Sequence, residues 1–286
     1  MRILVTGASG FVGTNVVSHS NSDYQVIPLY RDSGSCIDKG ARLYDGTFQS
    51  ILRALSGVDV VVHLATHYVA EHSESDIPNL INANVEFGVS LLEAMNQASV
   101  TRLVNVGTIW QKFNARDHAY GNLYAATKQA FQEVVSWYCD ARSFRALNLH
   151  LSDTYGPNDT RRKVLQLLID IAASGECLDM SLGEQKLELT YIDDVVEAIF
   201  EGCGQVREYE PSKNVTYSLL TGAQVSVREL AGIVSEVTGK PLNINWGGRP
   251  YREREFMDTP LSAYQVLPLW KPKVSLRKGV QSLVNV

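Results

Sequence analysis

The sequence lacks the features that mark a membrane protein, a metal-dependent fold or a nucleic-acid-binding protein. It has no apolar run of about 20 residues, so no membrane span is expected. A net charge of −5 over 286 residues gives no reason to expect nucleic acid or an anionic membrane as partner. The cysteines form no CxxC pair, which argues against a metal cage and favours reduced thiols in a cytoplasm. They are Cys36, Cys139, Cys177 and Cys203. A strand is predicted from the first residues onward, so no signal peptide is expected.

What the sequence does contain is a glycine-rich turn near its start, between a short apolar strand (1–6) and an apolar helical stretch. The turn reads TGASGFVG over residues 6–13. Gly7 would allow a tight turn, Gly10 would let the backbone approach a pyrophosphate, and Gly13 would let the helix pack close to the sheet. Free N–H groups at the helix N-terminus attract phosphates. The pattern predicts a dinucleotide site, and the alternative is an ordinary strand–turn–helix with accidental glycines.

Strand-like and helix-like segments alternate through the first half of the chain. Strands are expected at 26–30, 58–64, 102–106 and 144–151, and helices at 81–98 and 123–139. This alternation predicts an α/β fold, a doubly wound parallel (Rossmann) sheet. The second half is less regular, with helices expected at 163–174, 195–203 and 227–237 and a Gly/Pro-rich region at 241–272. We expect residues 1–155 with 190–222 to form the dinucleotide-binding domain, and 156–189 with 223–286 a smaller mixed lobe that holds the substrate.

A tyrosine and a lysine follow at the spacing of one helical turn. Tyr124 and Lys128 would share one helix face. A nearby ammonium favours the phenolate and lowers a tyrosine pKa, and the same lysine can bind the nicotinamide ribose. Thr108 follows the strand at 102–106, at the sheet edge where ligands bind, and could hold a substrate carbonyl oxygen. Together these residues predict redox chemistry on a carbonyl. The alternatives are a chance YxxxK pair and a simple turn threonine.

These motifs resemble those of the extended short-chain dehydrogenase/reductases that act on nucleotide sugars, and the resemblance covers most of the chain. Residues 153–157 (DTYGP) look like the NxYGP segment of that family, with Asp153 in place of Asn. Residues 190–195 (TYIDDV) look like its YVDDV segment. Residues 63–65 (HLA) match a segment that lies against the cofactor, and Asn84 matches an Asn on the next helix. The resemblance implies a nucleotide-sugar substrate.

The residues after Thr108 narrow the reaction class. Family dehydratases carry Asp-Glu there, whereas this chain has Ile109 and Trp110, which cannot act as acid or base. Residues 107–111 (GTIWQ) also depart from the SSxxVYG pattern of the 4-epimerases. Together with residues 122–131 (NLYAATKQAF) and 153–159 (DTYGPND), they look most like the CDP-abequose and CDP-paratose synthases, which reduce the 4-keto group of a CDP-3,6-dideoxyhexulose with NADPH. The resemblance therefore implies a 4-ketoreductase. The alternatives are a 4-epimerase with tightly bound NAD and a non-catalytic dinucleotide sensor.

The end of the second strand bears on the choice of cofactor. An NAD enzyme has Asp or Glu there, whereas this chain has Tyr30 and then Arg31, which favours the 2′-phosphate of NADP(H). Asp32 is the counter-argument, so NAD(H) stays open. Asp45 and Gly46 resemble the adenine contact of the family, or are simply a turn. The expected cofactor residues are Gly7, Ser9, Gly10, Phe11, Val12, Gly13, Arg31, Asp45, Gly46, Leu64, Ala65, Thr66, Tyr124, Lys128 and Leu151.

A nucleoside diphosphate needs cations on the substrate side. The family often has an Arg just before its YVDDV segment, but Leu187 stands there, so other cations would have to serve. The expected substrate residues are Trp110, Asp153, Arg161, Arg162, Lys186, Arg249 and Arg252. The alternative for the cations is solvated surface charge.

Two further expectations concern metals and oligomeric state. His63, His67 and His72 are interpreted as structural, because the proposed chemistry needs no metal and no strict ligand geometry is evident. The resemblance implies a homodimer through a four-helix bundle of the helices at 81–98 and 123–139. The apolar residues on these helices are Val85, Val89, Leu92, Phe131, Val134, Val135 and Trp137.

Overall fold

The computed structural model describes residues 1–20, 22–31 and 40–284. Within them, seven strands form one sheet in the order β11-β6-β5-β4-β1-β2-β3, and every pairing is parallel. The strands are β1 (Arg2–Thr6), β2 (Gln25–Tyr30), β3 (Arg42–Leu43), β4 (Val60–His63), β5 (Arg102–Thr108), β6 (Arg145–Leu151) and β11 (Asn214–Leu219). The strand order reverses between β1 and β4, which is the switch point where open α/β sheets bind ligands. The predicted doubly wound parallel fold is confirmed.

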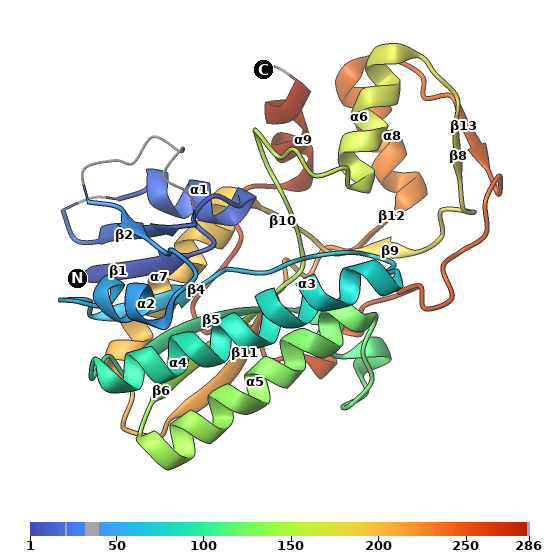
Figure 1. Cartoon of the computed structure of the whole chain (residues 1–286). Coiled ribbons are helices and arrows are strands. Elements are labelled where there is room, and N and C mark those ends of the chain that lie inside the picture. The colour runs from blue at the N-terminus through green and yellow to red at the C-terminus, as the bar shows by residue number, and fades with distance from the viewer. Residues whose placement is uncertain (21, 32–39, 285–286) are drawn as a thin grey trace.

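Helices cover both faces of this sheet (Figure 1). On one face lie α2 (Phe48–Ala54), α3 (Ile77–Ile81), α4 (Phe87–Gln97) and α5 (Leu123–Arg142), and on the other α1 (Phe11–Ser18) and α7 (Ile192–Glu208). Successive strand residues point to opposite faces. Leu4, Val61 and Leu103 therefore join the core under α4 and α5, whereas Val5, Val62 and Val104 join the core under α7.

The remaining elements form a second lobe beyond the carboxyl edge of the sheet (Figure 1). They are α6 (Val164–Ser174), α8 (Val227–Thr238), α9 (Leu276–Val284), and the strand pairs β7 (Asp153–Tyr155) with β10 (Leu189–Tyr191), β9 (Lys186–Leu187) with β12 (Val225–Ser226), and β8 (Leu178–Met180) with β13 (Ile244–Trp246). Leu168 of α6 and Leu230 of α8 belong to the same core cluster as Val62 and Leu149 of the sheet. The two lobes thus share one apolar core, and the domain boundaries expected above stay a prediction.

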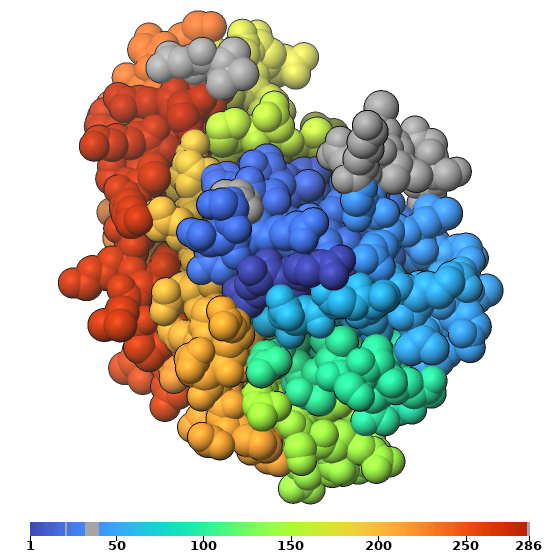
Figure 2. Space-filling view, turned by 90° about the vertical axis from the view of Figure 1, so that its left-hand side faces the viewer, coloured from blue at the N-terminus to red at the C-terminus, as the bar shows by residue number. Residues whose placement is uncertain are grey.

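The C-terminal part of the chain is tied to α7 rather than only to its own lobe. Asp194, 2% exposed in the TYIDDV segment, accepts hydrogen bonds from the backbone N–H of Lys273 (2.9 Å) and Val274 (3.1 Å). The indole of Trp270 donates to the Asp194 carbonyl at 2.9 Å. In Figure 2 the C-terminal residues, coloured red, run along the upper and middle part of the left-hand side of the molecule.

The helices expected at a dimer interface are only partly covered within the chain, since Val85, Val89 and Val134 are half-buried. Leu92, Phe131 and Val135 are fully buried against the sheet, whereas Trp137 on α5 is 52% exposed and Ile81 is 43% exposed. The homodimer stays a prediction. No helix in the described part of the chain has the length and apolar character needed to cross a membrane.

Candidate active site

The glycine-rich turn lies directly between β1 and the N-terminus of α1. Gly7 has φ +68°, and a Cβ there would lie 2.6 Å from the Ala65 nitrogen. A Cβ on Gly13 would lie 2.1 Å from the Gly7 carbonyl oxygen. Gly10 caps α1 without a side-chain hydrogen bond, so side chains leave the first N–H groups of this helix available. The turn has the shape that an approaching pyrophosphate requires.

Two neighbouring strand ends hold Leu64 and Ala65 beside this turn. The Ala65 N–H donates to Thr6 Oγ1 at 3.2 Å, and Thr6 Oγ1 shares a 2.8 Å hydrogen bond with His63 Nδ1. His63 is fully buried, and burial followed by the charge of Lys128 lowers its pKa well below the ordinary value. It is therefore a neutral histidine. Among the described residues no three His, Cys, Asp or Glu side chains gather as metal ligands.

Helix α5 carries Tyr124 and Lys128 on the face that meets the sheet edge. Its N-cap, Asn122, accepts from the Ala125 N–H at 2.9 Å and donates to the Ala70 carbonyl at 3.1 Å, which fixes where the helix begins. Lys128 is 2% exposed, and its ammonium makes no hydrogen bond or ion pair within the described residues. Burial lowers the pKa of Lys128 to about 8. Burying an ammonium without a hydrogen-bonding or charged partner costs free energy, so Lys128 is a candidate for contact with a bound ligand.

The tyrosine differs from the sequence expectation. Burial raises the pKa of Tyr124 to about 12, a much larger effect than the opposing hydrogen bond with Thr66 and the charge of Arg161, and Lys128 does not lower it. Desolvation thus outweighs the expected cationic stabilisation of the phenolate. Tyr124 keeps its proton at neutral pH, as a proton donor must.

Thr108 is the last residue of β5 and begins a tight turn. Its Oγ1 accepts from the Trp110 N–H at 3.3 Å, and its own N–H donates to Gln111 Oε1 at 3.0 Å. Gln111 is 2% exposed, and its Nε2 donates to Gln129 (2.8 Å) and Gln132 (3.0 Å) of α5. Gln111 therefore ties the threonine turn to the tyrosine helix. Sequence reasoning missed this residue because a lone glutamine carries no spacing signal.

An aromatic wall stands beside Tyr124. The Tyr68 ring meets the Tyr124 ring edge-on with centroids 5.0 Å apart, and Trp110 stacks on Phe256 at 5.5 Å. Tyr68 also lies 6.5 Å from Trp110. Tyr68 and Phe256 thus extend the apolar surface that Trp110 presents at this place. These two were missed because they come from distant loops.

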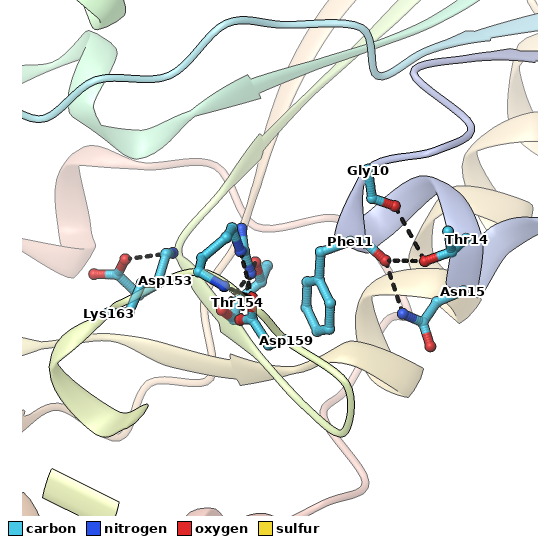
Figure 3. Close-up of polar contacts among 9 residues, drawn as sticks. Gly10, Phe11, Thr14, Asn15, Asp153, Thr154, Asp159 and Lys163 are labelled. Atoms are coloured by element: carbon cyan, nitrogen blue, oxygen red, sulfur yellow. Dashed lines mark hydrogen bonds and ion pairs between the residues drawn. The ribbon is translucent and has the colours of Figure 1, made fainter. Parts of the chain in front are cut away.

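Residues 153–163 face the glycine-rich turn at the carboxyl edge of the sheet (Figure 3). Asp153 accepts from Lys163 Nζ at 3.0 Å, so the aspartate that replaces the family asparagine has its own cation. Arg161 pairs with Asp159 through Nε (2.7 Å) and Nη2 (2.8 Å). In Figure 3 the Phe11 ring lies between α1 and this segment. Arg161 covers that ring, with its Cζ 4.5 Å from the centroid.

The other expected substrate cations are not gathered at one point. Arg162 and Arg249 are exposed, Lys186 lies 4.0 Å from Asp258, and Arg252 lies 3.4 Å from Glu71. Of these four, only Arg252 is close enough to the aromatic wall for its charge to influence the Tyr68 pKa.

The expected adenine end of the cofactor site lies around β2 and β3. Arg31 follows β2 and is exposed, whereas Asp32 falls outside the described residues. Asp45 accepts from the Thr47 side chain (2.5 Å) and backbone (3.0 Å), which chiefly lower its pKa to about 2, and Arg53 lies 3.1 Å away. Gly46 has φ +90°, so a turn conformation suits it. At the other end, Thr66 donates to Asn84 and Leu151 ends β6, 9% exposed.

Comparison with known proteins agrees with this arrangement. Residues 3–215 match the NAD dependent epimerase/dehydratase family. The CDP-abequose synthase of Yersinia pseudotuberculosis is 31% identical over 292 residues, covering 100% of both chains. The structure of MoeE5 in complex with UDP-glucose and NAD has a TM-score of 0.85 at 24% identity, covering 100% of this chain and 98% of that one. The UDP-glucose 4-epimerase of Thermus thermophilus with NAD has a TM-score of 0.80 at 22% identity, with the same coverage. The chain therefore belongs to the NAD dependent epimerase/dehydratase family, within the extended short-chain dehydrogenase/reductases.

Proposed function

We propose that this protein is an NADPH-dependent reductase of the 4-keto group of a nucleotide-activated deoxy sugar, such as a CDP-4-keto-3,6-dideoxyhexose. The observation that carries the proposal is that a protonated, half-buried Tyr124 and a buried Lys128 without a hydrogen-bond partner share one face of α5. A carbonyl reduction needs a proton donor for the forming hydroxyl. The similarity to CDP-abequose synthase over the full length supports the substrate class.

The residues present fit a dinucleotide. A Cβ on Gly7 or Gly13 would fill the turn, and the start of α1 offers uncapped N–H groups for a pyrophosphate. Lys128 offers an unpaired ammonium for the nicotinamide ribose hydroxyls. The bound dinucleotide would supply the hydride. The full set of proposed cofactor residues is the one given from the sequence, with Arg31 at the 2′-phosphate.

The chain's own groups then have distinct roles. Tyr124 gives its proton to the sugar O4, and Thr108 steadies that oxygen through its hydroxyl. Lys128 holds the cofactor ribose through its ammonium and so positions the dinucleotide beside Tyr124. His63 and His150, which lie within electrostatic range of Lys128, stay neutral. Burial lowers the pKa of both histidines, and it lowers that of His150 to about 3. Neutral neighbours keep the Lys128 charge available for the ligand.

The wall formed by Tyr68, Trp110 and Phe256 suits a deoxygenated sugar edge better than a hydroxyl-rich one. Ile109 and Trp110 offer no acid or base for dehydration. For the diphosphate and base the sequence candidates are Asp153, Arg162, Lys186, Arg249 and Arg252. Of the cations among them, Arg252 lies nearest the aromatic wall, and Lys163 compensates the charge of Asp153.

The second candidate is a 4-epimerase that keeps NAD bound, because Tyr124 and Lys128 would serve that reaction too. A non-catalytic sensor is disfavoured, since it would not need to retain both residues. Purified protein should be assayed for turnover with CDP-, dTDP-, UDP- and GDP-4-keto sugars and NADPH. Stoichiometric NADPH consumption on one of them supports the reductase. Epimer formation without consumption would support the epimerase, and no reaction on any would contradict both.

A further inference from the structure

The contacts of Arg161 point to a different ligand from the one that its sequence position suggests. Its guanidinium covers the ring of Phe11, with Cζ 4.5 Å from the centroid. Phe11 is the first residue of α1, directly after the glycine-rich turn. The same ring lies close to Gly156, where a Cβ would stand 3.4 Å from Phe11 Cζ. Arg161 therefore lies against the dinucleotide turn, although it belongs to the segment that leads into α6.

The guanidinium is held in one orientation. Nε donates to Asp159 Oδ1 at 2.7 Å, and Nη2 donates to Asp159 Oδ2 at 2.8 Å. Nη2 also donates to the carbonyl (3.1 Å) and hydroxyl (3.2 Å) of Thr154. The Asp159 side chain is only 9% exposed, so the carboxylate that holds the guanidinium is sheltered from water. A stacked, bidentate arginine is already ordered before any ligand arrives.

One nitrogen is left over. Nη1 has no hydrogen-bond partner among the described residues, and the Arg161 side chain is 36% exposed. The positive charge is also close enough to lower the pKa of Tyr124 against the effect of burial. Arg161 thus lies within electrostatic range of both the glycine-rich turn and the catalytic tyrosine. A dinucleotide whose nicotinamide lies beside Tyr124 would carry its diphosphate at the glycine-rich turn, next to the start of α1, where Arg161 stacks on Phe11.

We infer that Arg161 binds the pyrophosphate of the dinucleotide cofactor through Nη1, and not the diphosphate of the sugar nucleotide. The inference rests on the proposed function only in that a dinucleotide binds, and it holds equally for a reductase and an epimerase. Charge-assisted hydrogen bonds to phosphate are among the stronger polar contacts in proteins. Arg161 would add one from the 153–163 segment, opposite the N–H groups of α1.

Arg161 could bind the diphosphate of the cofactor or the diphosphate of the sugar nucleotide. The test therefore measures the binding of each ligand separately and without turnover. NADPH, NADH and CDP are titrated calorimetrically into the wild-type chain, Arg161→Gln and Arg207→Gln. Arg207 is exposed in the last turn of α7, at the far edge of the sheet, and serves as the matched control. Arg161→Gln should weaken NADPH and NADH by the same factor, about tenfold or more, and leave CDP unchanged. Arg207→Gln should change none of the three.

Loss of CDP affinity with cofactor affinity retained would overturn the inference in favour of the sugar nucleotide. Unchanged affinities for all three ligands would also overturn the inference, because Arg161 would then contact neither diphosphate. If Arg161→Gln does not fold, Arg161→Lys keeps the charge but loses the bidentate fork. A smaller loss, again equal for NADPH and NADH, is then expected, and no loss would contradict the assignment. A wild-type chain that binds neither cofactor would refute the proposed function itself, a result separate from any effect of Arg161.

Discussion

Asn84 Nδ2 donates a 2.9 Å hydrogen bond to Thr127 Oγ1, which in turn donates to the carbonyl of Tyr124 at 2.8 Å. The Oδ1 of the same asparagine accepts from Thr66 Oγ1 (2.8 Å) and from the His67 N–H (2.7 Å). Asn84 is fully buried within a π-helical turn, Asn82–Glu86, that interrupts the helix from α3 to α4. One side chain thus joins the loop after β4 to the helix that carries Tyr124 and Lys128.

Asn84→Leu should lower both stability and turnover. It leaves Thr66, His67 and Thr127 without their buried partner, at a cost of about 1–3 kcal/mol in the free energy of unfolding. Asn82→Ala, at an exposed position of the same π-helical turn, is the control. Thermal unfolding and steady-state kinetics measure both effects. An Asn84→Leu protein as stable and active as the control would contradict the linking role.

Tyr124→Phe should lower kcat by about 10²-fold or more, since it removes a positioned proton donor, while NADPH affinity stays nearly unchanged. Tyr138→Phe is a matched control, because Tyr138 lies on the same helix and its hydroxyl donates to Glu93 (2.9 Å), away from Lys128. Turnover of Tyr124→Phe at the wild-type rate would show that another group supplies the proton.

Lys128 should make the cofactor-free protein less stable near neutral pH. Burial lowers its pKa from 10.5 to about 8, so between these values the unfolded chain binds a proton that the folded chain does not. The free energy of unfolding therefore rises with pH from about 8 to 10.5, and the full cost of the buried charge is present below 8. Lys128→Met should raise the melting temperature at pH 7 by a few degrees and abolish turnover. The rise in melting temperature of Lys128→Met over the wild type should be smaller at pH 10. A melting temperature below that of the wild type at pH 7 would show that Lys128 stabilises the fold, contrary to this expectation.

Arg31→Ala should weaken NADPH binding and barely change NADH binding, because only NADPH has a 2′-phosphate for the guanidinium. Arg207→Ala is a control, since Arg207 is exposed in the last turn of α7 and belongs to no proposed cofactor contact. Fluorescence titration of both cofactors measures the change. Equal losses for NADPH and NADH would mean that Arg31 does not touch the 2′-phosphate.

The sequence predicted the elements whose chemistry depends on local spacing. Gly7 and Gly13 were identifiable because a turn this tight tolerates no Cβ, and Tyr124 and Lys128 because one helical turn separates them. The alternation of apolar strands and helices was enough for the doubly wound sheet. These features are encoded within a few neighbouring residues.

What the sequence could not predict depends on contacts between distant segments. Gln111 is meaningful only because β5 and α5 meet, and Phe256 reaches Trp110 from far along the chain. The direction of the Tyr124 pKa change depended on how deeply the fold buries the phenol, which spacing does not reveal. Likewise, a run of cations at 161–163 could not disclose that Arg161 stacks on Phe11 while Lys163 pairs with Asp153.

The proposed reaction, reduction at C4 of the sugar, consumes one NADPH for each sugar formed. The most direct measurement uses NADPH deuterated at the transferred position of nicotinamide C4, with a CDP-4-keto-3,6-dideoxyhexose as substrate. We expect deuterium at C4 of the released sugar and one NADPH oxidised per sugar formed. Label that stays on the cofactor, with a 4-epimer formed and no NADPH consumed, would contradict the proposed reaction.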